Sequence, residues 1–150
     1  VWRTSRSGWS PASVRWDTDS GSARWSPVSV VADRREARQA RLRASLAGSG
    51  LDGLVVQSLP NIRYLTGFTG SSALLLASAT EMVLVTDFRY ETQAEREVGP
   101  AARVEIDRAS VWQRLKRVMA ERTRHQVGFE AHIATVSDRG RLDEAGATTS

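Results

Sequence analysis

Residues 61–76, NIRYLTGFTGSSALLL, join an aromatic and glycine-rich turn to an uninterrupted aliphatic run. Pro60, just before them, can open a short helix, because a first-turn position needs no N–H. Gly67 can end that helix, and the aliphatic residues that follow predict a β-strand. The glycines at 67 and 70 would let a helix turn sharply into a core strand. The segment holds no nucleophile–base pair and no metal-ligand spacing, so it indicates a structural element of a folded core.

The segment before this stretch predicts a helix followed by a strand. Asp33 and Glu36 have the spacing of a capping box, which places the helix start at Asp33. Gly48 and Gly50 are typical of its end. Within the helix, alanines form one small-residue stripe with two leucines beside it: Ala37, Ala40, Ala44, Ala47, Leu42 and Leu46. Residues 54–56, LVV, form a short apolar run, as expected of a strand covered on both faces.

The segment after this stretch begins with a hairpin and a helix. Residues 73–77 and 82–86 are apolar runs joined by four residues, which predicts two antiparallel strands. Asp87 can cap the helix that follows, and Gly99-Pro100 ends it. Its expected buried line, at i, i+4 and i+8, is Tyr90, Ala94 and Val98.

Further along, residues 103–106 alternate charged and apolar side chains, which predicts a strand near the edge of a sheet. Ser110 and Gln113 have capping-box spacing and open another helix. Its apolar stripe is Val111, Leu115, Val118 and Met119. Residues 127–129 predict a last short strand.

A final helix is predicted by the pair Thr135 and Asp138, and it would carry Leu142. The order of elements is therefore α-β-α-β-β-α-β-α-β-α. Helices that alternate with strands imply a sheet with helices on both faces, and the hairpin makes that sheet mixed. We predict one three-layer α/β/α domain over residues 34–148.

Residues 1–33 differ from the rest of the chain. They contain four of the five tryptophans, and the hexamer WSPASV at 9–14 returns as WSPVSV at 25–30. No helical or strand period runs through them, so their tryptophans cannot gather on one buried face. A repeat this short is compatible with a binding motif. We favour a disordered or adventitious N-terminal tail.

The composition narrows the class of protein. A chain of 150 residues with 41% hydrophobic and 25% charged residues suits one globular domain. Cysteine is absent, which excludes a disulfide framework, a thiolate nucleophile and a cysteine-based zinc site. No apolar run approaches the roughly 20 residues that span a bilayer. This composition fits a cytoplasmic protein with no membrane partner.

The net charge of +4 and the pI near 10.5 resemble those of nucleic-acid-binding proteins. Lys116 is the single lysine, and the other basic residues are arginines, a skew that a GC-rich genome would produce without any selection for phosphate binding. Acidic residues are interspersed with the arginines, whereas a nucleic-acid surface gathers its basic residues on one face. We therefore expect no specific binding of nucleic acid.

The candidates for chemistry are few and isolated. His125 lies in a charged loop, and His132 follows a strand end beside Glu130. A Glu–His pair can do acid–base work, but a plain strand-to-helix loop explains the same residues. Asp87 sits where a strand meets a helix, which suits a catalytic carboxylate or an N-cap. Arg89 beside it could bind a carboxylate.

The turn GFTGSS at 67–72 contains the glycines of a phosphate loop without its spacing or its lysine. Ser71 and Ser72 have no nucleophile-elbow motif around them. The residues alone therefore indicate a well-formed domain without a catalytic constellation.

Four blocks follow one another between residues 50 and 130. They are GLDGLVV at 50–56, PNIRYLTGF at 60–68, TDFRY at 86–90 and VGFE at 127–130. In content and order these blocks resemble the N-terminal domain of the family that contains aminopeptidase P, Xaa-Pro dipeptidase (prolidase) and creatinase. The resemblance implies an α/β domain with a ribonuclease-H-like strand arrangement, in agreement with the pattern of elements.

The resemblance also implies that catalysis belongs elsewhere. In this family a second, C-terminal "pita-bread" domain carries two Asp, one His and two Glu that hold a pair of divalent metal ions. No residue of this chain maps onto those ligands. We therefore expect no catalytic residue, metal site or cofactor here, and Mn²⁺, Co²⁺ or Zn²⁺ only in that second domain.

The resemblance further implies that this domain helps to bound the active site and forms oligomer contacts. Arg63, Tyr64 and Phe68, next to the glycine turn, and Arg89 in the TDFRY block are the residues for which we expect such a role. The alternative is that Tyr64 and Phe68 belong to the core and that Arg63 is solvated.

The sequence thus predicts a non-catalytic N-terminal domain, present as a fragment, of a proline-specific metallopeptidase that is a homo-oligomer at full length. A stand-alone interaction module and a nucleic-acid-binding domain are alternative functions. Ribonuclease-H-type chemistry would need clustered carboxylates, and the strand ends offer only Asp87 and Asp107.

Overall fold

The computed structural model describes residues 27–121, 126–145 and 148–149, with 27–33 and 148–149 described by their backbone. The helices are α1 (Pro27–Ser49), α2 (Leu59–Thr66), α3 (Glu91–Val98), α4 (Val111–Ala120) and α5 (Val136–Glu144), and short 3-10 turns are η1 (Phe88–Tyr90) and η2 (Gly99–Ala101). The strands are β1 (Gly53–Val56), β2 (Ala73–Ser78), β3 (Met82–Asp87), β4 (Arg103–Asp107), β5 (Gln126–Phe129) and β6 (Thr148–Thr149).

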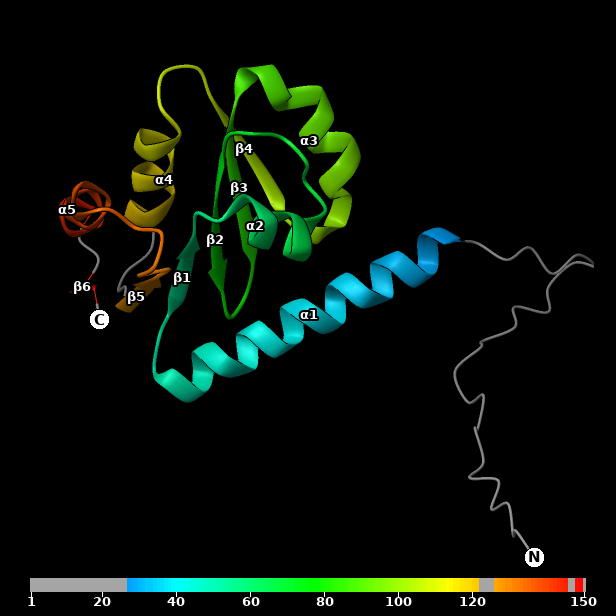
Figure 1. The fold of residues 1–150 in the computed structure, drawn as a ribbon, viewed down its shortest axis with the longest axis horizontal. Helices are drawn as coiled ribbons and strands as arrows, with labels where there is room; N and C mark the ends of the chain where they lie inside the picture. The colour runs from blue at the N-terminus through cyan, green and yellow to red at the C-terminus, as the bar shows by residue number, and fades with distance from the viewer. Residues whose placement is uncertain (1–26, 122–125, 146–147, 150) are drawn as a thin grey trace, which may run out of the picture.

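The strands form one mixed sheet in the order β4-β3-β2-β1-β5-β6 (Figure 1). Strand β2 runs antiparallel to β1 and β3, and the other neighbouring pairs are parallel. The predicted hairpin is β2–β3, and the predicted edge strand is β4. Strand β6 was not predicted. The mixed sheet that the sequence and the resemblance implied is confirmed.

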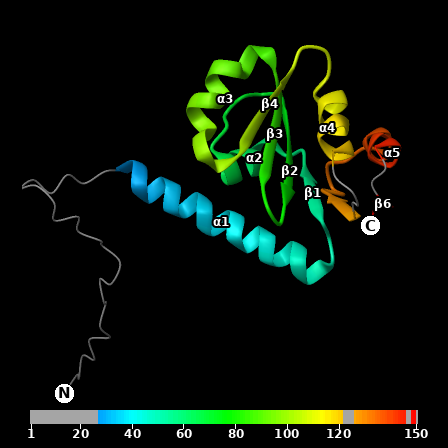
Figure 2. The same cartoon turned by 180° about the vertical axis from the view of Figure 1, so that it is seen from behind.

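The sheet is covered on both faces, as the apolar runs predicted. Every residue of β2 is buried, and successive residues enter opposite cores. Leu75 packs with α1, α2 and α3 on one face, and Leu76 packs with α4 and α5 on the other. Figure 2, seen from behind, shows the same division into three layers. The predicted α/β/α architecture is therefore confirmed.

Helix α1 departs from the prediction at its start and on its buried face. It begins at Pro27, so Asp33 lies inside the helix and is not its N-cap. A proline suits this position because the first turn needs no N–H. The predicted tail at residues 1–33 therefore overlaps the helix from residue 27, and residues 1–26 lie outside the described residues.

The alanine stripe of α1 does not form its buried side. Ala37, Ala40, Ala44 and Ala47 are all exposed, whereas Gln39 and Leu46 are buried. The side of α1 that faces the domain carries polar side chains, Arg35, Arg38 and Gln39, which donate hydrogen bonds to backbone carbonyls of other elements. Hydrophobic spacing alone does not reveal such contacts.

Two of the four predicted helix caps, Ser110 and Thr135, are present as predicted. Ser110 accepts a hydrogen bond from the Gln113 N–H, and Thr135 and Asp138 form a reciprocal capping box. Asp87 caps the short turn η1, which precedes α3, and does not cap α3 directly.

Within the part of the chain that the structure describes, no helix is both long and apolar enough to cross a membrane.

Candidate functional site

The glycine turn and the TDFRY block meet at one corner of the domain. The Phe68 ring is buried and lies edge-on against the Tyr90 ring, with centroids 5.7 Å apart. The Tyr90 hydroxyl and Ser71 Oγ are 2.6 Å apart, and Thr86 Oγ1 donates to the Ser72 carbonyl at 2.6 Å. These contacts tie two blocks that are about twenty residues apart in sequence into one unit.

Two glycines of this turn are required by geometry. Gly67 ends α2 with φ +86°, in the left-handed region, and a Cβ there would lie 2.3 Å from Arg35 Nη2. A Cβ at Gly70 would lie 2.2 Å from the Phe68 ring. Glycine is therefore needed at position 67 for the left-handed backbone, and at position 70 because the Phe68 ring lies against the backbone.

Glu130 connects the VGFE block to the start of α2. Its Oε2 accepts hydrogen bonds from the Gln57 N–H at 2.7 Å and the Ser58 N–H at 2.8 Å, and its Oε1 accepts one from the Asn61 side-chain amide. The carboxylate thus lies at the positive end of the α2 dipole. The sequence indicated Glu130 as a partner for His132 and as part of the VGFE block, but its hydrogen bonds to α2 were not predicted.

Side chains of α1 reach the other end of α2 and its surroundings. Arg38 donates to the Tyr64 carbonyl at 2.9 Å, and Gln39 donates to the carbonyls of Leu65 at 3.0 Å and Ala101 at 2.8 Å. Arg35 donates to the Glu97 carbonyl at 3.0 Å. Helix α1 therefore supplies donors to carbonyls at the C-terminal ends of α2 and α3.

Glu97 fixes the glycine turn from the side of α3. Its carboxylate accepts hydrogen bonds from the Thr69 N–H, the Thr69 hydroxyl and the Gln93 amide. Burial raises the pKa of Glu97, but these hydrogen bonds together outweigh burial and hold the pKa below its ordinary value. A charged Glu97 thus stabilises the turn.

The four predicted site residues occupy different environments. Arg63 is exposed, and Tyr64 is 51% exposed with its ring under the Arg38 guanidinium, 4.1 Å from the centroid. Phe68 is only 1% exposed, so its side chain belongs to the core and does not form a surface contact. Arg89 is exposed and lies after β3. Among the described residues, no hydrogen bond, ion pair or ring contact joins Tyr64 to Arg89.

The Arg89 guanidinium pairs with the neighbouring carboxylate of Asp87. Arg89 Nε and Nη2 donate to the two Asp87 oxygens at 2.9 and 2.8 Å. The side-chain hydrogen bond from Arg89 is the main reason that the pKa of Asp87 lies below its ordinary value, and burial opposes it. Asp87 is therefore a paired, charged cap and not a group poised to exchange protons near neutral pH.

Asp107 is the register partner of Asp87 on the neighbouring parallel strand. Its carboxylate accepts hydrogen bonds from the N–H groups of Ala109 and Ser110, which hold its pKa below the ordinary value. Each of these two carboxylates thus accepts hydrogen bonds from backbone N–H groups that directly follow its own strand, although the sheet places the two residues side by side.

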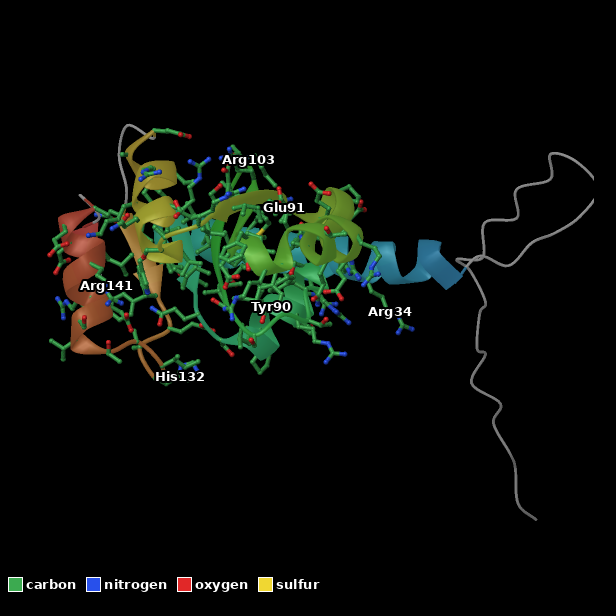
Figure 3. All side chains as sticks on the ribbon, turned by 90° about the horizontal axis from the view of Figure 1, so that it is seen from above. Arg34, Tyr90, Glu91, Arg103, His132 and Arg141 are labelled. Atoms are coloured by element: carbon green, nitrogen blue, oxygen red, sulfur yellow. The ribbon has the colours of Figure 1, made fainter. Side chains whose placement is uncertain are left out.

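The histidines form no acid–base pair in the described residues. His132 is exposed and lies at the periphery of the domain (Figure 3), while Glu130 is engaged with α2. His125 lies outside the described residues. No group of three or more histidine, aspartate or glutamate side chains in the part of the chain described here is arranged to hold a metal ion.

Residues 38–150 match the Creatinase/Prolidase N-terminal domain family, which covers most of the chain. The chain belongs to this family. The resemblance inferred from the four sequence blocks is therefore confirmed.

Solved structures agree with this assignment. The N-terminal domain of the cytoplasmic peptidase PepQ from Mycobacterium tuberculosis H37Rv is 39% identical, with a TM-score of 0.65 over 75% of this chain and 88% of that chain. An XXA-pro aminopeptidase from Streptococcus pyogenes is 28% identical, with a TM-score of 0.67 over 79% and 91% of the two chains. The Xaa-Pro dipeptidase from Bacillus anthracis shares the fold, with a TM-score of 0.69 at 24% identity.

This chain spans only part of the length of its longer relatives. The similarity spans 77% of this chain but 32% of the Bacillus anthracis dipeptidase. The uncharacterized peptidase YqhT from Bacillus subtilis (strain 168) is 43% identical over 58 residues, which is 39% of this chain and 16% of YqhT. The chain therefore corresponds to a minor part of the length of these peptidases.

Proposed function

We propose that this domain is the non-catalytic N-terminal domain of an Xaa-Pro peptidase and works next to a separate catalytic domain. The observation that carries the proposal is the family match over residues 38–150, together with relatives described as Xaa-Pro dipeptidases and aminopeptidases. In this proposal the domain bounds the active site and takes part in oligomer contacts. The divalent metal ions belong to the catalytic domain, and the location is the cytoplasm.

The surface that we assign to this role is the outer side of α2. Arg63 is exposed, and Tyr64 presents half of its surface to solvent while the Arg38 guanidinium stacks on its ring. A half-exposed aromatic ring with one guanidinium stacked on it, and a second exposed arginine next to it in sequence, offers apolar area and positive charge together. This combination suits contact with a peptide or with a partner surface that carries carboxylates. Arg89 is less suited to bind a carboxylate, because Asp87 already occupies its guanidinium.

A chimeric peptidase tests the proposal. Residues 34–150 replace the N-terminal domain of PepQ, and hydrolysis of the peptides that intact PepQ cleaves is measured beside intact PepQ and PepQ without its N-terminal domain. We expect the chimera to be active and to lose at least about tenfold in kcat/KM on Tyr64→Ala or Arg63→Ala, as for loss of an interface anchor. Arg108→Ala, at an exposed position after β4, is the control. Full activity of the PepQ form without any N-terminal domain would refute the proposal.

The chain alone should hydrolyse no Xaa-Pro peptide when Mn²⁺, Co²⁺ or Zn²⁺ is supplied. Peptide hydrolysis at neutral pH needs an activated water, and the family produces one with metal ions held by several converging ligands. In the described residues the carboxylates of Asp87, Asp107 and Glu130 each accept hydrogen bonds from nearby backbone N–H groups. Metal-dependent turnover that copurifies with the chain, and that Asp87→Asn or His132→Ala abolishes, would show that this domain is catalytic.

A further inference from the structure

Helix α2 lacks a local cap at its N-terminus. The side chain of its N-cap residue, Ser58, makes no capping hydrogen bond, and Pro60 contributes no N–H. Glu130, which lies 69 to 73 residues further along the chain, accepts hydrogen bonds from the N–H groups of Gln57 and Ser58 and from the Asn61 amide. The carboxylate of Glu130, the residue that follows β5, therefore accepts from the N-cap N–H, as the N3 carboxylate does in a capping box, and from the N–H of the residue before it.

The C-terminal end of α2 is held by the opposite charge. The Arg38 guanidinium donates to the Tyr64 carbonyl and also stacks on the Tyr64 ring. Gln39 donates to the next carbonyl, that of Leu65. An anion at the positive end and a cation at the negative end both complement the helix dipole.

Burial alone does not fix this helix. The inner face of α2 consists of Ile62, Leu65 and Thr66, which are buried in the core. Hydrophobic burial is non-directional, so it sets the depth of an eight-residue helix better than its rotation or its position along the sheet. Hydrogen bonds at the two ends supply the directional constraints.

We propose that Glu130 and Arg38 are positioning residues that clamp α2 at its two ends and thereby set where Arg63 and Tyr64 stand on the surface. The clamp itself is independent of any partner. The part of the inference that concerns Arg63 and Tyr64 rests on the proposed function.

Amide hydrogen exchange on the chain tests the clamp. In Glu130→Ala we expect exchange at residues 57–64 to accelerate about tenfold or more, as for lost charge-assisted hydrogen bonds. Glu130→Gln keeps one acceptor oxygen and should give a smaller acceleration. In Arg38→Ala the effect should appear at residues 63–66, and Arg38→Lys, which keeps the charge but not the planar stack, should rescue it only in part.

Asp107→Asn is the matched control, since Asp107 also accepts two backbone N–H groups but at the approach to α4. It should leave exchange in α2 unchanged. Unchanged α2 exchange in Glu130→Ala would overturn the clamp, as would an acceleration spread evenly over α2 and α4, because the residue would then contribute only global stability.

The PepQ chimera separates the clamp from the proposed function. If the clamp and the proposed function both hold, Glu130→Gln and Arg38→Ala should each lower kcat/KM, because they displace Tyr64. In a variant that already carries Tyr64→Ala, either change should then lower kcat/KM by less than about a further twofold. Asp107→Asn should have no effect. If the exchange result holds while the chimera is insensitive to Tyr64→Ala, the clamp stands and the proposed function fails. If both changes combine multiplicatively with Tyr64→Ala, positioning of Tyr64 by the clamp is refuted.

Discussion

Within each of the two helix layers of this domain, the helices are linked to one another in a different way. Helices α1, α2 and α3 are tied to one another by side chains that donate to backbone carbonyls, from Arg35, Arg38 and Gln39. Helices α4 and α5 are linked at the surface, by the Lys116–Glu144 ion pair and by Arg141 over the Trp112 ring at 5.3 Å. Both layers bury aliphatic side chains against the strands.

This difference separates what burial does from what hydrogen bonds do. Burial places each layer on its face of the sheet, and it does so equally for both. Directional hydrogen bonds then fix the helices of the first layer relative to one another, including α2 with its exposed Tyr64. The PNIRYLTGF and TDFRY blocks belong to this first layer or to its junction with the sheet.

The largest expected effect tests the claim that burial is equal in the two layers. Ile62 on α2 and Leu115 on α4 are both fully buried. Replacing either with alanine should lower the free energy of unfolding by about 2–5 kcal/mol, through lost burial and the cavity left behind. Urea denaturation of the two variants measures this directly. A loss below about 1 kcal/mol for one of them would show that its layer is loosely packed.

A smaller loss should be specific to the first layer. Gln39→Ala removes donors from two carbonyls, those of Leu65 and Ala101, in a buried place. An unsatisfied buried group costs about 1–3 kcal/mol, which should appear in the same urea experiment. Arg41→Ala, at an exposed position of α1, is the control and should change stability by less than about 0.5 kcal/mol. Equal losses for both variants would show that the hydrogen bonds of Gln39 do not stabilise the first layer.

Gln39 also marks the limit of prediction from the sequence. Strands β1 to β5, the hairpin, the caps at Ser110 and Thr135 and the three layers followed from apolar period and capping residues, because those signals are local. The face of α1 did not follow, since four regularly spaced alanines suggested one side and a glutamine occupies the other.

The candidate site was predictable only through resemblance. The family blocks identified residues 60–68 and 86–90, and local chemistry suggested that Arg89 binds a carboxylate. The contact of Glu130 with the start of α2 could not be predicted from spacing, because its partners lie more than sixty residues away and include backbone N–H groups. Phe68 was expected at a surface by one interpretation, but the close approach of Gly70 and Tyr90 draws it into the core.

The pH dependence of stability should also distinguish the first layer. Glu97 has a pKa below its ordinary value of 4.5 in the folded protein. The unfolded chain therefore binds more protons in acid, so the contribution of Glu97 is present above pH 4.5 and is lost as pH falls through the folded pKa. We expect Glu97→Gln to be less stable than the parent chain at pH 6 and the two to converge in acid. Urea midpoints measured between pH 3 and pH 7 test this, and a difference independent of pH would show that the charge of Glu97 is not involved.

The smallest expected effect belongs to the second layer. Lys116 and Glu144 form an ion pair between α4 and α5, and the hydrogen bond from Lys116 is the main reason that the pKa of Glu144 lies below its ordinary value. The Glu144 side chain is 70% exposed, so water and salt screen the pair, and holding two long side chains together costs entropy. We therefore expect Lys116→Ala to leave the urea midpoint unchanged within error, at both 0.05 and about 0.5 M salt. A midpoint that falls in low salt and recovers in high salt would show that α5 depends on this charge pair. The second layer would then be fixed by polar contacts as the first one is, and the contrast between the two layers would be lost.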